Sequence, residues 1–440
     1  MSEIGLISLA LVFALISVLI MGLPLAFTLG GIGVIFLFLL SGHQALNMII
    51  FRTYGLMQSF ILIAGPLFIF MGAIIEQSGL GDRLYETMQN WMGGLRGGLA
   101  MGTILICALF AAMTGVSATA TVTMGIIALP AMLRRGYDSR LAVGSISAGG
   151  ALGVLIPPSV IMIIYALMAE ESVGGLFAGG LFPGLVLVVL FILYIGIRAH
   201  FQPKLAPVVP SEERVGWRMK FVSLRGVILP ICIVIAVLGS IFAGIASPSE
   251  AAAVGAFGAI LSALIYRTLS WKILKDSTIR TLKLTCLLMW IIIGASAFTG
   301  VYSYLGASSL IQEIVQELEV NRWIILAAIQ STYFILGMFL EATGILMLTM
   351  PIYLPLIKAL EFNTLWFGVL FVMNMEMGFL TPPFGFNLFY MKAIVPKSIT
   401  MGDIYRSIVP FVLLQAIGLV VVIIFPEIAL WLPRLLFGSA

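Results

Sequence analysis

Charged side chains are scarce in this chain, since only 10% of its 440 residues are Asp, Glu, Lys or Arg, whereas 61% are hydrophobic. A typical soluble domain carries about 25% charged residues. The scarcity of charge therefore excludes an ordinary soluble protein and predicts an all-α polytopic membrane protein. The net charge of +4 is small, so the positions of the basic residues carry more information than their number.

Residues with catalytic or metal-binding chemistry are equally few. The three cysteines lie in apolar runs without metal-ligand spacing, which is typical of inert packing residues: Cys107, Cys232 and Cys286. No glycine-rich phosphate loop with a lysine occurs, so no ATP-driven step is visible. The string Gly-Val-Ser-Ala, ending at Ala118, is faintly similar to intramembrane serine proteases, but the two histidines, His43 and His200, lie at or outside the expected membrane ends. We therefore predict that the protein is not an enzyme and uses no cofactor.

Paired prolines interrupt two of the long apolar runs. The run 365–391 contains Gly-Phe-Leu-Thr-Pro-Pro-Phe-Gly-Phe-Asn at 378–387, and the run 141–167 contains Gly-Val-Leu-Ile-Pro-Pro-Ser at 153–159. Each run is long enough to cross a membrane, which takes about 20 residues, but adjacent prolines remove backbone donors and break the helix. Freed backbone groups are tolerated in a membrane only inside protein or beside a wet cavity. Such breaks indicate the ion and substrate site of a transporter.

The two broken runs are related by one offset, 382 − 157 = 225 residues. The same offset relates pairs spread along most of each half: Gly30 and Gly255, Gly33 and Gly258, Leu80 and Leu305, Pro130 and Pro355, Gly153 and Gly378, and Tyr165 and Tyr390. We interpret the chain as two copies of one unit. The alternative is a chain with two unrelated proline-kinked helices.

Each copy is predicted to contain five membrane crossings and one shorter hairpin. The crossings are expected at 4–21, 25–40, 60–76, 141–167 and 176–197 in the first copy, and at 227–245, 249–266, 284–304, 364–391 and 408–431 in the second. The hairpins, at about 99–133 and about 323–356, turn at 114–118 and 341–343. Arms of about 14 apolar residues span about 21 Å, less than a bilayer core of ~30 Å. We therefore expect re-entrant hairpins, and two closely spaced full crossings are the alternative.

An odd number of crossings per copy turns the second copy upside down relative to the first. With the N-terminus outside, 19 of the 23 basic residues fall in cytoplasmic segments (23 − 4 = 19), and the four exceptions are Arg52, Arg322, Lys358 and Arg434. The positive-inside rule selects this topology, in which both termini are periplasmic. The predicted organisation is a first inverted repeat at 1–197, a basic cytoplasmic linker at 198–225 and a second inverted repeat at 226–440.

The two hairpin turns and the two breaks are expected to meet near the middle of the membrane. Half-helix N-termini offer amide donors and partial positive charge, which suit a substrate carboxylate. Unwound carbonyls and half-helix C-termini suit a cation such as sodium. Hydroxyl groups stand at or near these points, at Ser117, Thr119, Thr121, Thr343 and Thr381. Ile156 occupies the first-copy position that matches Thr381, so the two cation sites are predicted to differ.

Two acidic residues lie near these points within apolar segments, Glu341 at the second turn and Glu376 just before the second break, with Asn374 and Asn387 nearby. Ionisable residues inside a membrane are rare and usually functional. No lysine or arginine lies in the same stretches, which favours contact with a cation or substrate, or protonated carboxyls. The alternatives are that Glu341 is a hydrated turn residue and that Glu376 or Asn374 only satisfies freed backbone groups.

Several strings resemble the large membrane subunit of TRAP transporters, the DctM-like family: TGVSATATVTMGIIALPAM, GALGVLIPPS, GMFLEATGILMLTMPIYLP and MGFLTPPFGFNLF. The similarity extends over nearly the whole chain. It implies an elevator-type ion-coupled transporter architecture with two inverted-topology repeats, placed in the bacterial inner membrane. It also implies sodium-gradient-driven uptake of an organic acid, a periplasmic substrate-binding protein as a partner, and a small four-helix membrane subunit on a separate chain.

The resemblance also assigns site residues. The first sodium site would use Ser117, Ala118, Gly153 and Pro157, and the second would use Glu341, Thr343, Gly344, Gly378, Thr381 and Pro382. Substrate contacts are expected from Thr119, Thr121, Ser159, Glu376 and Asn387. Many members of the family have an acidic residue followed by proline at the second turn, whereas Ala342 follows Glu341 here, which bears on the geometry of this turn.

Two other functions remain open at this point. A stand-alone sodium/dicarboxylate symporter of the same superfamily is the alternative within transport, and a non-transporting membrane scaffold is the alternative outside it. Broken helices with hydroxyl-rich turns argue against a scaffold, because that architecture is costly without a ligand. The substrate class also stays open among dicarboxylates, sialic acid, other sugar acids, and aromatic or keto acids.

Overall fold

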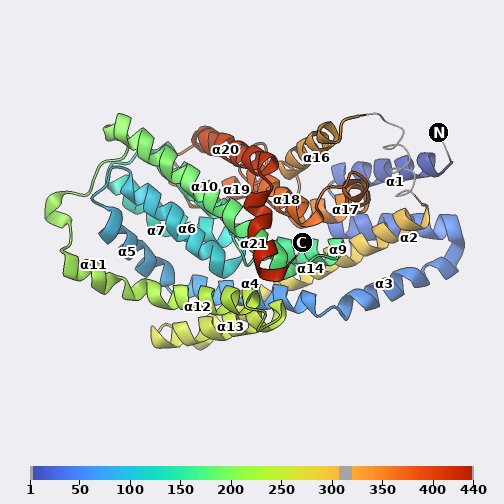
Figure 1. The fold of residues 1–440 in the computed structure, drawn as a ribbon, viewed down its shortest axis with the longest axis horizontal. Helices are drawn as coiled ribbons and strands as arrows, with labels where there is room; N and C mark the ends of the chain where they lie inside the picture. The colour runs from blue at the N-terminus through green and yellow to red at the C-terminus, as the bar shows by residue number, and fades with distance from the viewer. Residues whose placement is uncertain (1–2, 307–319, 439–440) are drawn as a thin grey trace.

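The computed structural model describes residues 3–306 and 320–438, and all regular structure within these ranges is helical. Eight of the described helices are long and apolar enough to cross a membrane, or nine if the bent pair α3–α4 counts as one span. The prediction of an all-α polytopic membrane protein is therefore confirmed. Figure 1 shows the helices as an elongated bundle with α5 and α11 near one end and α1, α2 and α3 near the other.

The first half of the chain forms ten α-helices and a single 3-10 turn that interrupts the fourth expected crossing. They are α1 (Glu3–Ile20), α2 (Leu25–Ala45), α3 (Asn47–Met57), α4 (Ile61–Gln77), α5 (Leu80–Met92), α6 (Gly98–Thr114), α7 (Ser117–Arg134), α8 (Ser139–Ala151), η1 (Leu152–Val154), α9 (Val160–Ala169) and α10 (Val173–Phe201).

The second half repeats most of this order after a linker that contains the short helix α11 (Trp217–Ser223). Its helices are α12 (Arg225–Phe242), α13 (Pro248–Ile265), α14 (Trp271–Tyr304), α16 (Arg322–Gly337), α17 (Ala342–Ala359), α18 (Thr364–Gly378), α19 (Phe386–Ile394), α20 (Met401–Ile424) and α21 (Glu427–Phe437). Helices α7 and α17 start and end at the predicted offset, since 342 − 117 = 225 and 359 − 134 = 225.

Several helices differ in length from the expected crossings. Helix α14 has 34 residues and its counterpart is the pair α3–α4, which is bent by 57°. The expected crossing 408–431 is two helices, because the chain turns at Phe425 and Pro426 between α20 and α21. The expected arm 323–340 ends as a helix at Gly337, so the second turn spans 338–341. Between α20 and α21, Pro426 has no backbone N–H to donate and stands as the N-cap of α21, so the chain turns there.

Three of the four hairpin arms are longer than the sequence suggested, and α16 is shorter. Helices α6 and α7 have 17 and 18 residues, or about 26 Å each, and α7 and α17 pass the length and hydropathy test for a membrane span by themselves. The argument from arm length therefore does not separate re-entrant hairpins from closely spaced full crossings. The re-entrant hairpins stay a prediction.

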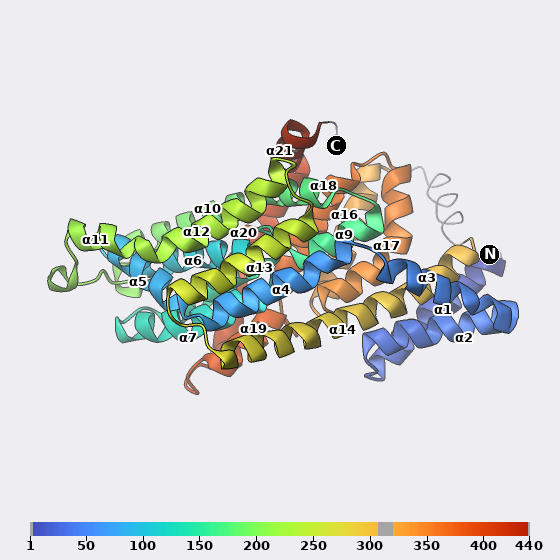
Figure 2. The same cartoon turned by 90° about the horizontal axis from the view of Figure 1, so that it is seen from below.

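The two halves are interleaved by reciprocal helix pairs. Helix α2 packs along α14, and its counterpart α13 packs along α4 (Figure 2). A Cβ added to Gly33 of α2 would lie 2.9 Å from the carbonyl carbon of Ala297, and one added to Gly255 of α13 would lie 2.5 Å from the sulfur of Met71. Helix α8 packs on α20 in the same way as α18 packs on α10. Exchange of equivalent contacts between halves is the pattern that a two-fold relation produces.

The linker between the halves is fastened by backbone hydrogen bonds. Gly97 donates its N–H to Ala206 O at 3.2 Å, Asp138 donates to Leu205 O at 2.8 Å, and Val209 donates to Gly93 O at 2.9 Å. The same segment carries the ion pair between Arg135 and Glu213, 2.9 Å apart. The linker therefore packs along the α5–α6 and α7–α8 turns.

Candidate functional site

The first hairpin turn closes tightly on the first break. Gly115 makes the bend with a φ of 63°, and a Cβ added there would lie 2.4 Å from the carbonyl oxygen of Pro158. Gly153 lies against the turn in the same way, since its added Cβ would be 2.9 Å from the Cα of Ser117. Residues 153–159 are all buried. Only glycine fits at both contact points, so this half of the site has one compact arrangement.

The hydroxyl of Ser117 links the first turn to the second broken helix. It donates a hydrogen bond of 2.7 Å to Oδ1 of Asn387, the second residue of α19, and the Asn387 amide lies 3.5 Å from the carbonyl oxygen of Ser147. Ser117 and Asn387 are 4% and 1% exposed. The sequence separates these two residues by 270 positions, so the pair is a tertiary contact between the two halves.

The second turn meets its break through different residues. Gly337, at the end of α16, lies against Gly378, whose added Cβ would be 2.8 Å from the Gly337 Cα. Phe384 donates its backbone N–H to Met338 O at 3.3 Å. Thr381 is only half-buried and lies in the break itself, where it donates its hydroxyl back to the last turn of α18, to Met377 O at 2.8 Å. The second break is therefore more open to its surroundings than the first.

Glu341 caps the N-terminus of α17. Its carboxylate accepts hydrogen bonds from the backbone N–H and from the hydroxyl of Thr343, both at 3.0 Å. This is the arrangement of an N-cap, in which a side-chain oxygen satisfies a free amide of the first turn. Gly344, one residue further, packs against Leu25 of α2, since its added Cβ would lie 2.0 Å from a methyl carbon of Leu25. The tip of the second hairpin thus leans toward α2.

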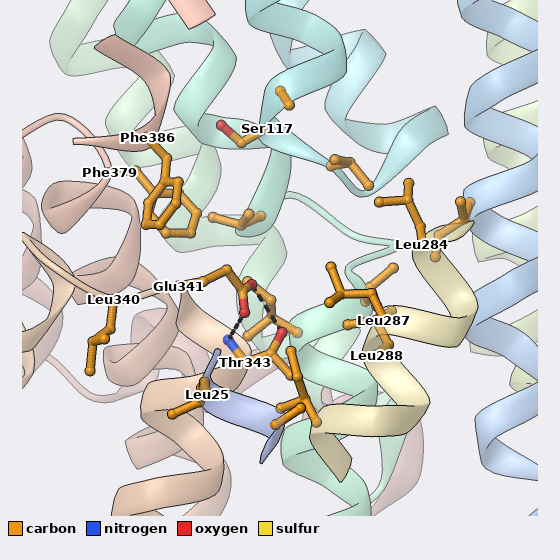
Figure 3. A pocket seen from close by; sticks show the side chains of 18 of the residues that line it. Leu25, Ser117, Leu284, Leu287, Leu288, Leu340, Glu341, Thr343, Phe379 and Phe386 are labelled. Atoms are coloured by element: carbon orange, nitrogen blue, oxygen red, sulfur yellow. Dashed lines mark hydrogen bonds between the residues drawn. The ribbon is translucent and has the colours of Figure 1, made fainter. Parts of the chain in front are cut away.

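A cavity of about 640 Å³ lies between the two turns. Figure 3 shows Ser117 on one side of it and Glu341 with Thr343 on another, while Leu284, Leu287 and Leu288 of α14 project from a third side. Phe379 and Phe386, which flank the second break, lie beside the same space. The walls are mostly apolar, and polar groups come from both turns, Asn387 and Tyr390. No lysine or arginine of the described residues lines it.

The cavity is surrounded by the N-terminal ends of four helices. The first residues of α7, α9 and α19 line it, and α17 contributes its cap Glu341 and its second residue Thr343. Ser159 caps α9 and Glu341 caps α17 with side-chain oxygens, whereas the caps of α7 and α19, Val116 and Gly385, supply none. Helix N-termini carry free amides and a partial positive charge. The arrangement suits an anionic group near α7 and α19, without a basic side chain.

The structure brings five of the predicted site residues to the cavity wall: Ser117, Ala118, Glu341, Thr343 and Asn387. Four more lie in the turn-and-break contacts behind that wall: Gly153, Pro157, Gly344 and Gly378. Pro157 and Pro382 each precede a second proline through a cis peptide bond. Thr381 and Pro382 lie in the half-buried second break.

The remaining predicted substrate residues do not line the cavity. Thr119 is buried in α7, Ser159 donates to Val154 O at 2.6 Å, and Thr121 packs on Gly150 without a hydrogen-bond partner among the described residues. Glu376 is fully buried on α18 and faces α20 through Gln415. Direct contact of these four side chains with a molecule in the cavity would need a rearrangement.

Sequence reasoning missed the wall that α14 supplies. Leu284, Leu287, Leu288 and Ile291 recur at helical spacing, but such a stripe is equally typical of a lipid-facing or core surface. Tyr390 could have been found, because the repeat offset pairs it with Tyr165. Tyr165 is buried and donates its hydroxyl to Thr364 O at 2.6 Å, whereas Tyr390 is exposed at the cavity.

Known proteins share both the sequence and the fold of this chain. The profile of the family "Tripartite ATP-independent periplasmic transporter, DctM component" matches residues 12–428. The C4-dicarboxylate TRAP transporter large permease protein DctM of Pseudomonas aeruginosa is 32% identical over 90% of this chain and 91% of its own length. The match therefore includes both hairpins, both breaks and the cavity between them.

The names of other relatives give different substrates. The ectoine TRAP transporter large permease protein TeaC of Halomonas elongata is 28% identical, covering 97% of this chain and 99% of its own. The sialic acid TRAP transporter large permease protein SiaM of Vibrio cholerae is 26% identical, covering 97% and 98%. The crystal structure of the Alcanivorax borkumensis YdaH transporter has a TM-score of 0.62 at 12% identity, covering 92% of this chain and 96% of that one, which shows a shared fold alone.

Proposed function

Because the chain belongs to the family of DctM components of tripartite ATP-independent periplasmic transporters, we propose that it carries an organic anion into the cell, driven by a sodium gradient. Family membership makes the chain a multi-pass permease subunit of the inner membrane and not an enzyme. The observation that carries the proposal is the cavity of about 640 Å³, on which four helix N-termini converge without any basic side chain among the described residues.

We propose that the carboxylate of the substrate binds at the N-termini of α7 and α19, which no side chain caps. Amides at helix N-termini bind anions without needing a formal positive charge. The apolar walls from α14, Phe379 and Phe386 suit an apolar part of the substrate. Glu341, the polar group that lies across the cavity from these N-termini, is itself acidic. A second carboxylate beside Glu341 would be repelled, so the lining favours a monocarboxylate, or one that carries a donor group, over a dicarboxylate. Dicarboxylates, ectoine and sialic acid appear in the names of relatives.

Sodium is the proposed coupling ion because the two turn-and-break contacts offer oxygen ligands, which are neutral at the first contact and include the Glu341 carboxylate at the second. The first site would use Ser117, Ala118, Gly153 and Pro157, and the second would use Glu341, Thr343, Gly344, Gly378, Thr381 and Pro382. Unwound carbonyls and hydroxyls form the type of site that takes a hard cation. In the first site no described side chain titrates, so a proton has nothing to bind there. At least two sodium ions per cycle, one for each half, are expected.

The proposed movement is of the elevator type. Helices α2, α4, α13 and α14 form reciprocal pairs that serve as the fixed part, and the hairpins with the broken helices form the moving part. The apolar stripe of α14 faces the cavity and offers a surface with few specific polar contacts. The reciprocal packing supports two repeats at 1–197 and 226–440. The orientation is proposed from the positive-inside rule, with the basic linker 198–225 in the cytoplasm and both termini in the periplasm.

The proposed partners are a small four-helix membrane subunit and a periplasmic binding protein that delivers the substrate. A surface for the small subunit is available on α1 and α2, where large apolar side chains are exposed, among them Phe13 at 74% and Leu39 at 73%. A fused permease of the same family occurs in Oleidesulfovibrio alaskensis, the isethionate TRAP transporter permease protein DctMQ. We place the small subunit against α1 and α2.

Uptake into proteoliposomes tests these proposals. Vesicles with this chain and its small subunit are supplied with the loaded binding protein and an inward sodium gradient, using radiolabelled succinate, phenylacetate and N-acetylneuraminate as probes. Uptake should rise as a sigmoidal function of sodium concentration, and should favour the monocarboxylates. Full uptake on a proton gradient with choline in place of sodium contradicts sodium coupling. Strong uptake of free substrate by this chain alone contradicts the tripartite assembly and favours a stand-alone symporter.

A further inference from the structure

Helices α11 and α12 form one long membrane helix whose N-terminal end is basic. Leu224 is the residue between them, and its φ of −58° and ψ of −21° are helical. Trp217–Phe242 is accordingly one apolar span of 26 residues, which is about 39 Å long against a bilayer core of ~30 Å. With the orientation proposed above, α11 therefore lies at the level of the lipid headgroups in the cytoplasmic leaflet.

One side of this helix is apolar and exposed over most of its length. Large side chains recur there at helical spacing, and we call them the outer stripe: Trp217, Phe221, Ile228, Ile231 and Ile235. Their exposed fractions run from 43% to 69%. Residues three, four and seven positions apart lie on the same side of a helix. The outer stripe therefore faces away from the described part of the chain along one line.

The aromatic end of the outer stripe is held in place by α5. Trp91 of α5 packs edge-on against Trp217 and Phe221, with ring centroids 6.3 and 5.7 Å away. Its indole N–H donates a hydrogen bond of 3.0 Å to Lys220 O. Tryptophan is enriched where the apolar core of a membrane meets the headgroups. The packing on α5 thus fixes two aromatic side chains at the depth that a lipid headgroup occupies.

Basic residues surround this aromatic end: Arg214, Arg218, Lys220 and Arg225. None of the four forms an ion pair with a described residue, and no Asp or Glu occurs between positions 217 and 242. Arg218 and Arg225 are exposed. Because they are 225 − 218 = 7 residues apart, they lie on the same flank of the helix, about 10 Å apart along its axis. Two extended arginine side chains can reach one headgroup from these positions.

The acidic side chains of neighbouring segments do not neutralise this cluster. Glu213 pairs with Arg135 at 2.9 Å. Asp82 and Glu86 of α5 line a groove that faces α7, on another side of that helix. Glu212 is exposed in the linker and forms no ion pair in the described ranges. The positive charge beside the outer stripe is therefore free to attract an anion.

We propose that the outer stripe and its basic end bind an anionic phospholipid of the cytoplasmic leaflet. Arg218 and Arg225 contact the phosphate of the headgroup, Trp217 and Phe221 pack beside the glycerol backbone, and residues 228–235 contact an acyl chain. Clusters of basic residues directly cytoplasmic of a membrane helix attract anionic lipids. The site involves neither the cavity nor the sodium sites, and only its assignment to the cytoplasmic leaflet rests on the proposed orientation.

Charge complementarity favours a lipid over a protein as the occupant. A partner helix that covered the outer stripe would remove Arg218 and Arg225 from water, which is costly unless each charge is paired. A lipid phosphate pairs with both while its acyl chain covers the isoleucines. The surface proposed for the small subunit, on α1 and α2, lies near the opposite end of the bundle from α11 (Figure 1).

A fluorophore at Cys232, which is exposed beside the outer stripe, reports on the lipid at this site. Cys286→Ser leaves Cys232 as the exposed cysteine, because Cys107 is buried. The labelled complex, with its small subunit, is reconstituted in phosphatidylcholine bilayers that contain brominated phosphatidylglycerol or brominated phosphatidylcholine as quencher. Quenching measures the affinity of each lipid for the site, and phosphatidylglycerol should bind about 25-fold more tightly, at about fivefold for each arginine.

The double variant Arg218→Gln with Arg225→Gln should remove this preference for phosphatidylglycerol. The matched control is Lys397→Gln with Arg406→Gln, which removes two other exposed basic residues and should leave the preference unchanged. A measurement on the wild type keeps the proposal testable if the double variant does not fold. Raising the ionic strength from about 0.05 to about 0.5 M should weaken the preference, because salt screens exposed charges.

Each other outcome overturns the proposal. Equal quenching by the two brominated lipids, a preference that salt does not change, or the same loss in the control variant shows that the arginines select no headgroup. Quenching by phosphatidylglycerol in this chain alone, but not in the complex, shows that the small subunit covers the outer stripe. Sodium-driven uptake is measured separately, so the proposed function stands or fails independently of these results.

Discussion

The two hairpin turns occupy equivalent positions in the two halves and yet close in different ways. Gly115 bends the first turn with a positive φ, and only two residues separate α6 from α7. The equivalent position in the second half is 115 + 225 = 340, a leucine. Leucine is strained at positive φ, so the second turn needs the four residues 338–341 and ends α16 earlier. Gly115 therefore allows the compact first turn, whereas Leu340 does not allow the same turn in the second half.

The difference continues at the breaks. The first break is entirely buried, with Ile156 at 4% exposure, whereas its counterpart Thr381 is half-buried and Phe384 is 52% exposed. The second tip packs on Leu25 of α2, which belongs to the proposed fixed part. We therefore propose that, within the moving part, the first turn and break form the more rigid pair and the second hairpin is the more mobile one.

The largest expected effect concerns the side of the membrane on which each labelled loop is exposed, and it is all-or-none. In a variant without native cysteines, Gly216→Cys in the linker should react with an impermeant thiol reagent only from the cytoplasm. Val320→Cys, directly before α16, should react only from the periplasm. Both positions are exposed. Labelling of right-side-out and inside-out vesicles measures this. Reaction of both cysteines from the same side would contradict the inverted repeats and remove the basis for comparing the two turns.

A large effect is expected from Gly115→Ala. The new Cβ would lie 2.4 Å from Pro158 O at a positive φ, and strain plus overpacking should cost roughly 2–6 kcal/mol. We expect a lower unfolding temperature and nearly complete loss of sodium-driven uptake. The matched control is Leu340→Ala at the equivalent position, which should leave the unfolding temperature near that of the wild type. Equal destabilisation by both variants would show that the two turns do not differ.

A smaller effect should separate the two sodium sites. Ser117→Ala leaves the buried Asn387 oxygen without its donor, a loss of about 1–3 kcal/mol, or about five- to 150-fold in sodium affinity. Thr381→Ala removes a hydroxyl that is half-buried and bonded to the adjacent last turn of α18, so its shift should stay below about tenfold. Sodium titrations of uptake measure both shifts. Ser331→Ala, an exposed hydroxyl bonded to Ala327 O in the same manner, is the control and should change nothing. A larger shift for Thr381→Ala would reverse the proposed order of rigidity.

Much of the fold follows from local sequence. Apolar runs, paired prolines and one offset located the helices and both breaks within a few residues, because helix formation and proline disruption are properties of the backbone at each position. The lengths of the hairpin arms and the boundary between α20 and α21 were harder to predict, because the end of a helix depends on a few residues and on their neighbours in space. The candidate site was predicted in part. Residues at the turns were found, while the α14 wall and the buried position of Glu376 were not.

By itself, the sequence determined an all-helical membrane chain built from two similar units, each with a hairpin and a broken helix. Only the tertiary structure decided which side chains face the cavity. Asn374 and Glu376 are two residues apart on one helix, yet Asn374 donates to Gln330 of α16 while Glu376 faces Gln415 of α20. Residues two apart on a helix point to nearly opposite sides, and the neighbour on each side comes from a distant part of the chain. The surroundings of a buried polar group are therefore set by packing between elements that no local pattern can pair.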